Sequence, residues 1–180
     1  MRTFREFQDT QIEPHPAYAR HPSVSTVGLI TAHNPMGVRQ SDRLNFDANG
    51  KLLEDIRRLG CKATVVHGMY AGHREETYLL VNVRRQDLMR VARRHRQDAI
   101  IWGFRSMDDN GHQLHMYYLD NGVVQADKML EVRPEDLDTP EAFFEAIKSG
   151  KVNLPNFTPR RSAVAVVPKE DLGDYQYGTD

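Results

Sequence analysis

Four short apolar runs restrict the fold of this sequence more than any other feature. The first run, residues 24–32, is almost entirely β-branched and apolar and ends at His33-Asn34-Pro35. A short run of this composition, closed by a turn signal, is typical of a buried strand. None of the runs reaches the roughly 20 apolar residues that a membrane-spanning helix needs. We therefore predict three further strands, at residues 61–67, 77–83 and 99–104.

Two segments between these runs carry apolar residues at intervals of three and four, the spacing of one helix face. The first begins at an N-cap residue, Ser41 or Asp42, and ends before Gly60, the residue type that commonly follows a helix. The second segment, residues 87–96, has its inner face formed by Leu88, Val91 and Ala92. The order of elements over residues 24–105 is therefore β-α-β-β-α-β.

This order predicts an α+β fold of the ferredoxin-like kind, a sandwich with two helices on one face of a four-stranded antiparallel sheet. A C-terminal hairpin at residues 114–132 is expected next, because Asn121-Gly122 separates two apolar strands. Thr139-Pro140 then begins a short helix that ends at Gly150.

The domain organisation follows from these elements. We expect an N-terminal arm at residues 1–23 and one domain, including the hairpin, at residues 24–132. The short helix and an extended tail then occupy residues 133–180, in which residues 162–167 resemble a strand.

Composition excludes several classes of protein. Lys and Arg number 24 and Asp and Glu 25, so the net charge of -1 argues against a polybasic or a highly charged disordered chain. The N-terminus has no apolar run typical of a signal peptide, and the single cysteine, Cys61, excludes an internal disulfide and a Cys-based zinc site. The scattered histidines lack an HExxH spacing, so we expect no metal. A cytoplasmic location without membrane contact is predicted.

The near-neutral total conceals two oppositely charged regions. Residues 84–105 hold seven arginines and two aspartates, whereas residues 135–180 hold nine acidic and five basic residues. The arginine-rich helix could bind nucleic acid or a phosphate, or simply present a solvated face. We expect the acidic segment to lie against this helix, in the same or a neighbouring subunit, which makes nucleic acid an improbable partner.

Polar residues at the chain connections are the candidate site residues. Thr31, His33 and Asn34 stand at the end of the first strand, where ligand-binding groups are common. The alternative is a turn that only terminates the strand. Gln97, between a helix and a strand, can bind an amide or adenine edge or only cap the helix.

A second candidate segment is residues 68–76, which begins with an expected loop from Gly68 to Gly72 and ends just before a predicted strand. Tyr70 offers an aromatic face, and Glu75 and Glu76 supply negative charge. An aromatic ring beside carboxylates can hold a cation such as an ammonium or a sulfonium. The alternative is a mobile loop with a solvated charge cluster.

A series of short motifs resembles known families. The series is Thr31-Ala32-x-Asn34-Pro35, Asn45, Gly60, Gly72 with Glu75 and Thr77, and residues 92–103 around Gln97-Asp98. It resembles a family of small bacterial and phage proteins catalogued as a domain of unknown function, which carries a TAxNP motif. It is also similar to the phage S-adenosylmethionine (SAM) lyases, once called SAM hydrolases. The resemblance spans residues 24–131.

The resemblance implies a PII-like, ferredoxin-like subunit that forms a homotrimer and binds SAM between subunits, as substrate and without a cofactor. The carboxylate of SAM would attack its own γ-carbon, expelling methylthioadenosine and leaving homoserine lactone, which in a phage would serve anti-restriction. By matching position, Glu75 or Glu76 would hold the cationic part of the substrate. Tyr70 would lie near the sulfonium, and Gln97 would order the site, whereas Thr31, His33 and Asn34 are assigned from the strand-end argument.

Two alternatives remain open from the sequence. The same fold could be a non-catalytic PII-like module that binds an adenosyl compound, a nucleotide or a protein. A third function, oligonucleotide binding through Arg90, Arg93 and Arg94, would weaken steeply with salt.

Overall fold

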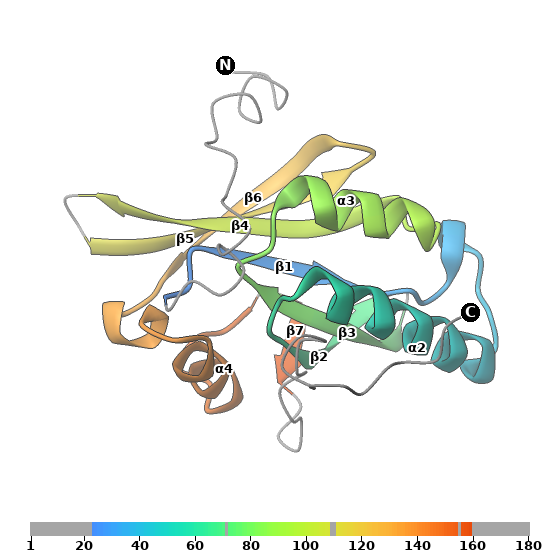
Figure 1. Ribbon diagram of the computed structural model, residues 1–180, viewed down its shortest axis with the longest axis horizontal. Helices are drawn as coiled ribbons and strands as arrows, with labels where there is room; N and C mark the ends of the chain where they lie inside the picture. The colour runs from blue at the N-terminus through green and yellow to red at the C-terminus, as the bar shows by residue number, and fades with distance from the viewer. Residues whose placement is uncertain (1–22, 71, 109–110, 155, 160–180) are drawn as a thin grey trace.

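One antiparallel sheet with helices on both faces forms the centre of the protein in the computed structural model (Figure 1). The structure describes residues 23–70, 72–108, 111–154 and 156–159. The seven strands lie in the order β6-β5-β4-β1-β3-β2-β7. Their bounds are β1 (Thr26–Ile30), β2 (Ala63–Tyr70), β3 (His73–Val81), β4 (Ala99–Asp108), β5 (Gly111–Asp120), β6 (Val123–Glu131) and β7 (Phe157–Pro159). The helices are α2 (Asp42–Leu59), α3 (Arg85–Arg94) and α4 (Pro140–Lys148), with short 3-10 turns η2 (Pro35–Gly37) and η3 (Pro134–Leu137).

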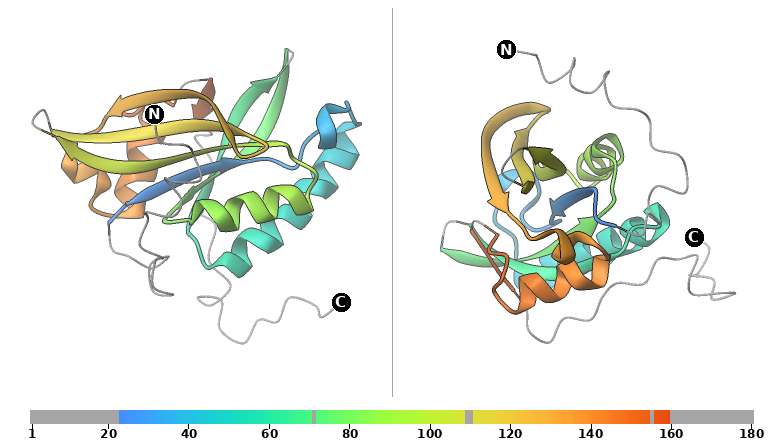
Figure 2. Two further views of the ribbon diagram at one scale, coloured as in Figure 1. Left: turned by 90° about the horizontal axis from the view of Figure 1, so that it is seen from above. Right: turned by 90° about the vertical axis from the view of Figure 1, so that its left-hand side faces the viewer.

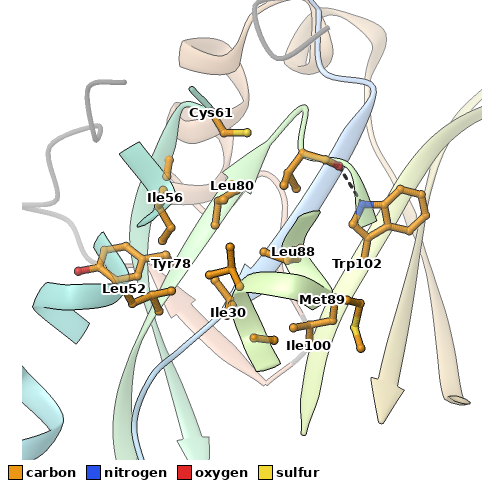
Figure 3. Packing of buried hydrophobic residues seen from close by; sticks show 14 of the residues in the cluster. Ile30, Leu52, Ile56, Cys61, Tyr78, Leu80, Leu88, Met89, Ile100 and Trp102 are labelled. Carbon is orange, nitrogen blue, oxygen red and sulfur yellow. Dashed lines mark hydrogen bonds between the residues drawn. The ribbon is translucent and has the colours of Figure 1, made fainter. Parts of the chain in front are cut away.

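Helices α2 and α3 cover one face of the sheet and enclose one of the two hydrophobic cores (Figure 2). Figure 3 shows Leu52 and Ile56 of α2 and Leu88 of α3 directed toward Ile30 of β1 and neighbouring strand residues. Trp102 of β4 closes this core, and its indole N–H donates to the Val83 carbonyl at 3.0 Å. A buried tryptophan needs such a partner for its polar end.

The opposite face is covered by α4 and η3. Phe143, Phe144 and Ile147 of α4 pack in a second core that includes Leu29 of β1 and Leu79 of β3. Because β1 is buried on both faces along its whole length, its sequence cannot alternate apolar with polar residues. This explains the unbroken apolar run from which the strand was predicted.

The sheet is strongly curled, and Figure 2 shows β5 and β6 turning out of the plane of β2 and β3. A register shift between Tyr118 and Leu119 interrupts the β5–β6 pairing, and such irregularities increase local bending and twist. The face that carries α4 is therefore concave where the two halves of the sheet approach each other.

The predicted α+β class, with helices against an antiparallel sheet, is confirmed, and so are the helix caps. The Ser41 hydroxyl accepts from the Leu44 amide at 3.3 Å, and Gly60 ends α2 with a φ of 75°. Thr139 caps α4 in the same way. Asn121 and Gly122 both have positive φ at the hairpin turn, as an Asn-Gly turn requires.

The predicted loop at residues 68–72 is wrong. β2 continues through Gly68 to Tyr70, and β3 begins at His73, so Glu75 and Glu76 lie within a strand. The apolar runs identified only the buried parts of these strands, whereas the hydrogen-bonded ladder continues into exposed sequence. For the same reason β4 extends beyond the predicted residue 104, to Asp108.

Strand β7 was not predicted, because three residues between prolines carry little strand signal. Phe157 pairs with Gly68, and its ring lies where a side chain on Gly68 would be, 2.9 Å from the position of an added Cβ atom. The predicted N-terminal arm up to residue 22 and the strand-like run at residues 162–167 lie outside the described residues.

The arginines of α3 are largely paired within the fold. Arg84 and Arg90 contact Asp87, and Arg94 contacts Asp55. The guanidinium of Arg85 lies 5.7 Å from the centre of the Trp102 ring, and burial lowers its pKa to about 10.

Within one subunit the acidic residues at positions 135–145 do not lie against α3, because α4 and η3 cover the other face of the sheet, and contact with a neighbouring subunit stays a prediction. Glu141 of α4 instead receives a 2.7 Å bond from Lys62, and Asp136 pairs with Arg133. Residues 160–180, the rest of the acidic segment, lie outside the described residues. Within the described ranges, no helix has the length and apolar character to span a membrane.

Gly28→Ala is expected to destabilise the protein by about 1–3 kcal/mol, the usual cost of overpacking a core. An added Cβ atom would lie 2.5 Å from the Leu88 side chain and 2.9 Å from that of Val83, and both neighbours are fully enclosed. Urea unfolding measures the change. The control is Gly50→Ala on the exposed side of α2, which has open space around it and is expected to gain about 1 kcal/mol. Equal effects of the two changes would contradict the packing of α3 on β1.

Candidate functional site

A cavity of about 410 Å³ opens at the carboxyl end of β1. It lies on the concave face of the sheet, because Leu29, Ile101 and Phe157, which line it, also pack in the core beneath α4. Its remaining walls come from the segment after β1, from β2 and β3 on one side, and from β4 and β5 on the other. The polar residues that line it are Thr31, His33, Asn34, Glu75, Thr77, Gln97, Asp98, Tyr118, Asp120 and Asn156.

An amide and a carboxylate form the centre of one wall. The side-chain N–H of Asn34 donates to Glu75 Oε1 at 2.8 Å, and both residues are half-buried. Asn34 has a φ of 48°, a left-handed conformation that asparagine tolerates better than most residues. The 3-10 turn at Pro35 follows directly, so the chain leaves β1 sharply and turns this amide toward β3.

Two asparagines on one face of α2 hold this wall from behind. Asn45 Oδ1 accepts from the Asn34 backbone at 2.9 Å, and its amide nitrogen donates to Asn34 Oδ1 at 3.1 Å. Asn49 accepts from the Ala32 backbone at 2.8 Å and donates to the Glu76 carbonyl at 2.9 Å. Both are buried, so α2 fixes the end of β1 to β3 through hydrogen bonds that are shielded from water.

Two further contacts complete the frame of the cavity. The Thr31 hydroxyl donates to the Glu76 carbonyl at 2.8 Å. On the other side, the Gln97 side chain donates to the His33 carbonyl at 2.9 Å, and the Met36 amide donates to the Arg96 carbonyl at 2.9 Å. The segment after β1 is therefore held by the end of α3 as well as by α2.

The electrostatic character of the cavity is negative. Three carboxylates line it, those of Glu75, Asp98 and Asp120, and no lysine or arginine is among the described residues around it. A concave wall of one charge sign raises the local concentration of ligands with the opposite sign. This cavity is therefore suited to a cation and poorly suited to a phosphate.

His33 does not alter this balance. Burial lowers its pKa, and the carboxylates of Glu75, Glu76 and Asp42 oppose this effect only in part. The imidazole is therefore neutral at pH 7, and it adds hydrogen-bonding capacity to the wall without adding positive charge.

Five of the seven predicted site residues meet at this cavity, namely Thr31, His33, Asn34, Glu75 and Gln97. Glu76 is not part of the wall, because consecutive residues of a strand point to opposite faces of the sheet. Tyr70 ends β2, paired with His73, and its side chain lies outside the described part of the structure. The hydrogen bonds of Asn34 and Gln97 are made to protein groups.

The sequence analysis missed several residues of the site. Asp98 follows Gln97 directly but was not singled out as a site residue, whereas Asp120 and Phe157 reach the cavity through strand pairing with Ala99 and Gly68. Asn45 and Asn49 were detectable, because two asparagines four residues apart on the inner face of an amphipathic helix are buried polar groups that need partners. No group of three or more potential metal ligands occurs among the described residues.

Comparison with known proteins gives one family match. The sequence model of a family described as "Protein of unknown function (DUF3293)" matches residues 30–100, a range that includes Asn34, Glu75 and Gln97. The expected resemblance to a family of unknown function is confirmed at this level, and the match does not test the Thr31–Pro35 motif. No curated protein matches the sequence.

Among solved structures, a phage SAM lyase in complex with S-methyl-5'-thioadenosine is similar to this chain. The identity is 11%, the alignment covers 62% of this chain and 91% of that chain, and the TM-score is 0.26. At this TM-score the similarity carries no weight for the function of this chain.

The half-buried His33 predicts a pH dependence of stability. Because its folded pKa is lowered, the unfolded state binds more protons, so stability is lost as the pH falls below the ordinary histidine value of about 6.5. The unfolding free energy should therefore fall more between pH 7 and pH 5 in the wild type than in His33→Gln, as measured by urea titration. His73→Gln, at an exposed position, should behave like the wild type. Identical pH profiles for the wild type and His33→Gln would contradict the burial of this ring.

Proposed function

We propose that this protein is a lyase that binds S-adenosylmethionine in the cavity at the end of β1 and cleaves its carbon–sulfur bond. The observation that carries the proposal is an acidic cavity in which Glu75 is held by Asn34 and no basic side chain is among the described lining residues. SAM carries two positive groups, a sulfonium and an ammonium. A fixed carboxylate in a partly buried wall is a suitable partner for either of them.

The size and the apolar lining of the cavity support the same ligand. Its volume of about 410 Å³ lies within the range of roughly 300–1,000 Å³ typical of small-molecule sites. Leu29, Ile101 and Phe157 offer an apolar surface for an adenine ring. The three carboxylates would repel the phosphates of ATP, which favours an adenosyl ligand without phosphate.

The proposed reaction is an intramolecular displacement. One carboxylate oxygen of SAM attacks the γ-carbon and forms a C–O bond. The γ-carbon–sulfur bond breaks, and its electron pair remains on sulfur, which becomes the neutral thioether of methylthioadenosine. The other product is homoserine lactone, whose ammonium group is unchanged, so no proton transfer and no cofactor are needed.

The protein must fold the methionine part of SAM into a reactive shape and remove water from its carboxylate. In our proposal Glu75 binds the substrate ammonium, which draws that cation away from the attacking carboxylate. Because the ammonium keeps its charge throughout the reaction, this contact is not lost in the transition state. The neutral His33 and the enclosed end of β1 limit the water around the reacting groups.

We also propose that β1 to β4 with α2 and α3 form a ferredoxin-like unit, and that three PII-like subunits assemble around inter-subunit sites. The strand order β4-β1-β3-β2 and the two helices on one face support the first part. Light scattering after size exclusion tests the second part, for which a mass of three chains is expected and a monomer would contradict it.

A non-catalytic adenosyl-binding module is the second candidate. It is favoured by the commitment of two of the three lining amides, those of Asn34 and Gln97, to bonds with protein groups. Thermal unfolding in the presence of SAM distinguishes the two functions, because a sensor is stabilised by SAM without consuming it.

The lyase proposal predicts that the protein converts SAM to methylthioadenosine and homoserine lactone, which chromatography resolves. Glu75→Gln should lower kcat/KM by about 10- to 100-fold, the effect of losing a charged hydrogen bond of about 1.5–3 kcal/mol. Glu76→Gln, the same substitution one residue further on the opposite face, is the matched comparison and should remain within about threefold of the wild type. Methylthioadenosine absent from the wild-type reaction would exclude the lyase, and a loss confined to Glu76→Gln would exclude the role of Glu75.

A further inference from the structure

Asn45 and Asn34 form a reciprocal pair at the base of the cavity. Asn45 lies in the first turns of α2, where only 5% of its surface is exposed. Its carbonyl oxygen accepts from the Asn34 backbone, and its amide nitrogen donates to the Asn34 side-chain oxygen. The Gln40 backbone N–H donates to that same oxygen at 2.9 Å.

These contacts leave one orientation for the Asn34 amide. Two donors converge on its oxygen, so its nitrogen must face Glu75. Rotating the amide by half a turn would place its N–H groups against two donors and its carbonyl against the Glu75 carboxylate. All three contacts would then be repulsive, whereas in the observed orientation all three are satisfied.

We propose that Asn45 is a positioning residue of this site, which acts through Asn34 to fix the Glu75 carboxylate. Among the described contacts, the bond from Asn34 is the one that holds the Glu75 side chain, and it leaves the second carboxylate oxygen to the ligand. Asn45 lines no part of the cavity. The effect of Asn45 on catalysis rests on the proposed function, whereas its coupling to Glu75 does not.

Asn45→Asp tests the proposal with almost no change of shape. The new carboxylate still accepts from the Asn34 backbone, but it replaces the donor to Asn34 Oδ1 with a repulsive acceptor. We expect KM for SAM to rise about tenfold with little change in kcat, because the contact between Glu75 and the ammonium is the same in the ground state and the transition state. A purely structural role would reduce the amount of active enzyme and leave KM unchanged, and that result would overturn the proposal.

Asn49→Asp is the matched control, because Asn49 lies one turn further along α2 and is 2% exposed. Its described side-chain hydrogen bonds go to the backbone of Ala32 and Glu76, and not to the Asn34 or Glu75 side chain. The substitution removes one buried donor, as Asn45→Asp does, so the loss of stability should be similar. Its KM should stay within about twofold of the wild type. An equal rise of KM in both variants would assign the effect to general loosening of α2.

A double-mutant cycle on unfolding tests the coupling without any assay of SAM. Asn45→Asp should raise the unfolding equilibrium constant about tenfold in the wild type and about threefold or less in a Glu75→Gln background. In that background a rotated Asn34 amide can donate to the new carboxylate at position 45 and accept from the new amide at position 75, so only its contact with the Gln40 N–H is repulsive. The new carboxylate at position 45 also no longer lies near a second negative charge. Additive effects would overturn the positioning role.

The double-mutant cycle tests the positioning role of Asn45, and the turnover assay tests the lyase activity, so one can fail without the other. A coupled cycle with no methylthioadenosine formed would retain the positioning role and reject the lyase, whereas turnover with an additive cycle would do the reverse. If Asn45→Asp does not fold, Asn45→Ala replaces it in the same cycle. The alanine variant removes both hydrogen bonds without adding a charge, and additivity would again overturn the proposal.

Discussion

The burial of β1 on both faces is the constraint on which the rest of the structure depends. A strand enclosed by α2 and α3 on one side and by α4 on the other can carry no polar side chain along its centre without a partner. Polar chemistry is therefore confined to the point where the strand ends, and the chain turns away there through Asn34 and Pro35. The cavity lies at this point because it is the first place along β1 where a side chain can be both fixed and accessible.

Much of this arrangement could be predicted from local sequence. Strands buried on both faces produce unbroken apolar runs, and Ser41, Gly60 and Asn121-Gly122 are chemically suited to the caps and turns that they form. The exposed ends of the strands were missed because they are stabilised by ladder hydrogen bonds, which any residue except proline can make. β7 was missed because its pairing partner, β2, lies about 90 residues away in sequence.

The residues of the candidate site were also predictable only in part. Thr31, His33, Asn34, Glu75 and Gln97 were identified because they are polar residues near chain connections, and the structure places all five around one cavity. The sequence could not choose between Glu75 and Glu76, because that choice depends on strand alternation, and the strand was expected to begin only after both residues. Asp98 and Asp120 reach the same cavity as Glu75 through the pairing of β4 with β1 and of β5 with β4, which no short motif encodes.

Phe157 packs against Gly68, so the cavity wall combines two distant stretches of the sequence. This combination has a consequence for how the protein could vary in evolution. The segment matched by the family, residues 30–100, contains the amide–carboxylate pair, whereas Tyr118, Asp120 and Phe157 come from later in the chain. The two parts of the cavity wall thus come from separate stretches of the sequence. Relatives that keep the first stretch and replace the second would retain the Glu75 carboxylate. The wall formed by the later residues, and so the shape of the ligand that fits, would change. Ligand preference among such relatives could diversify without any change at Glu75.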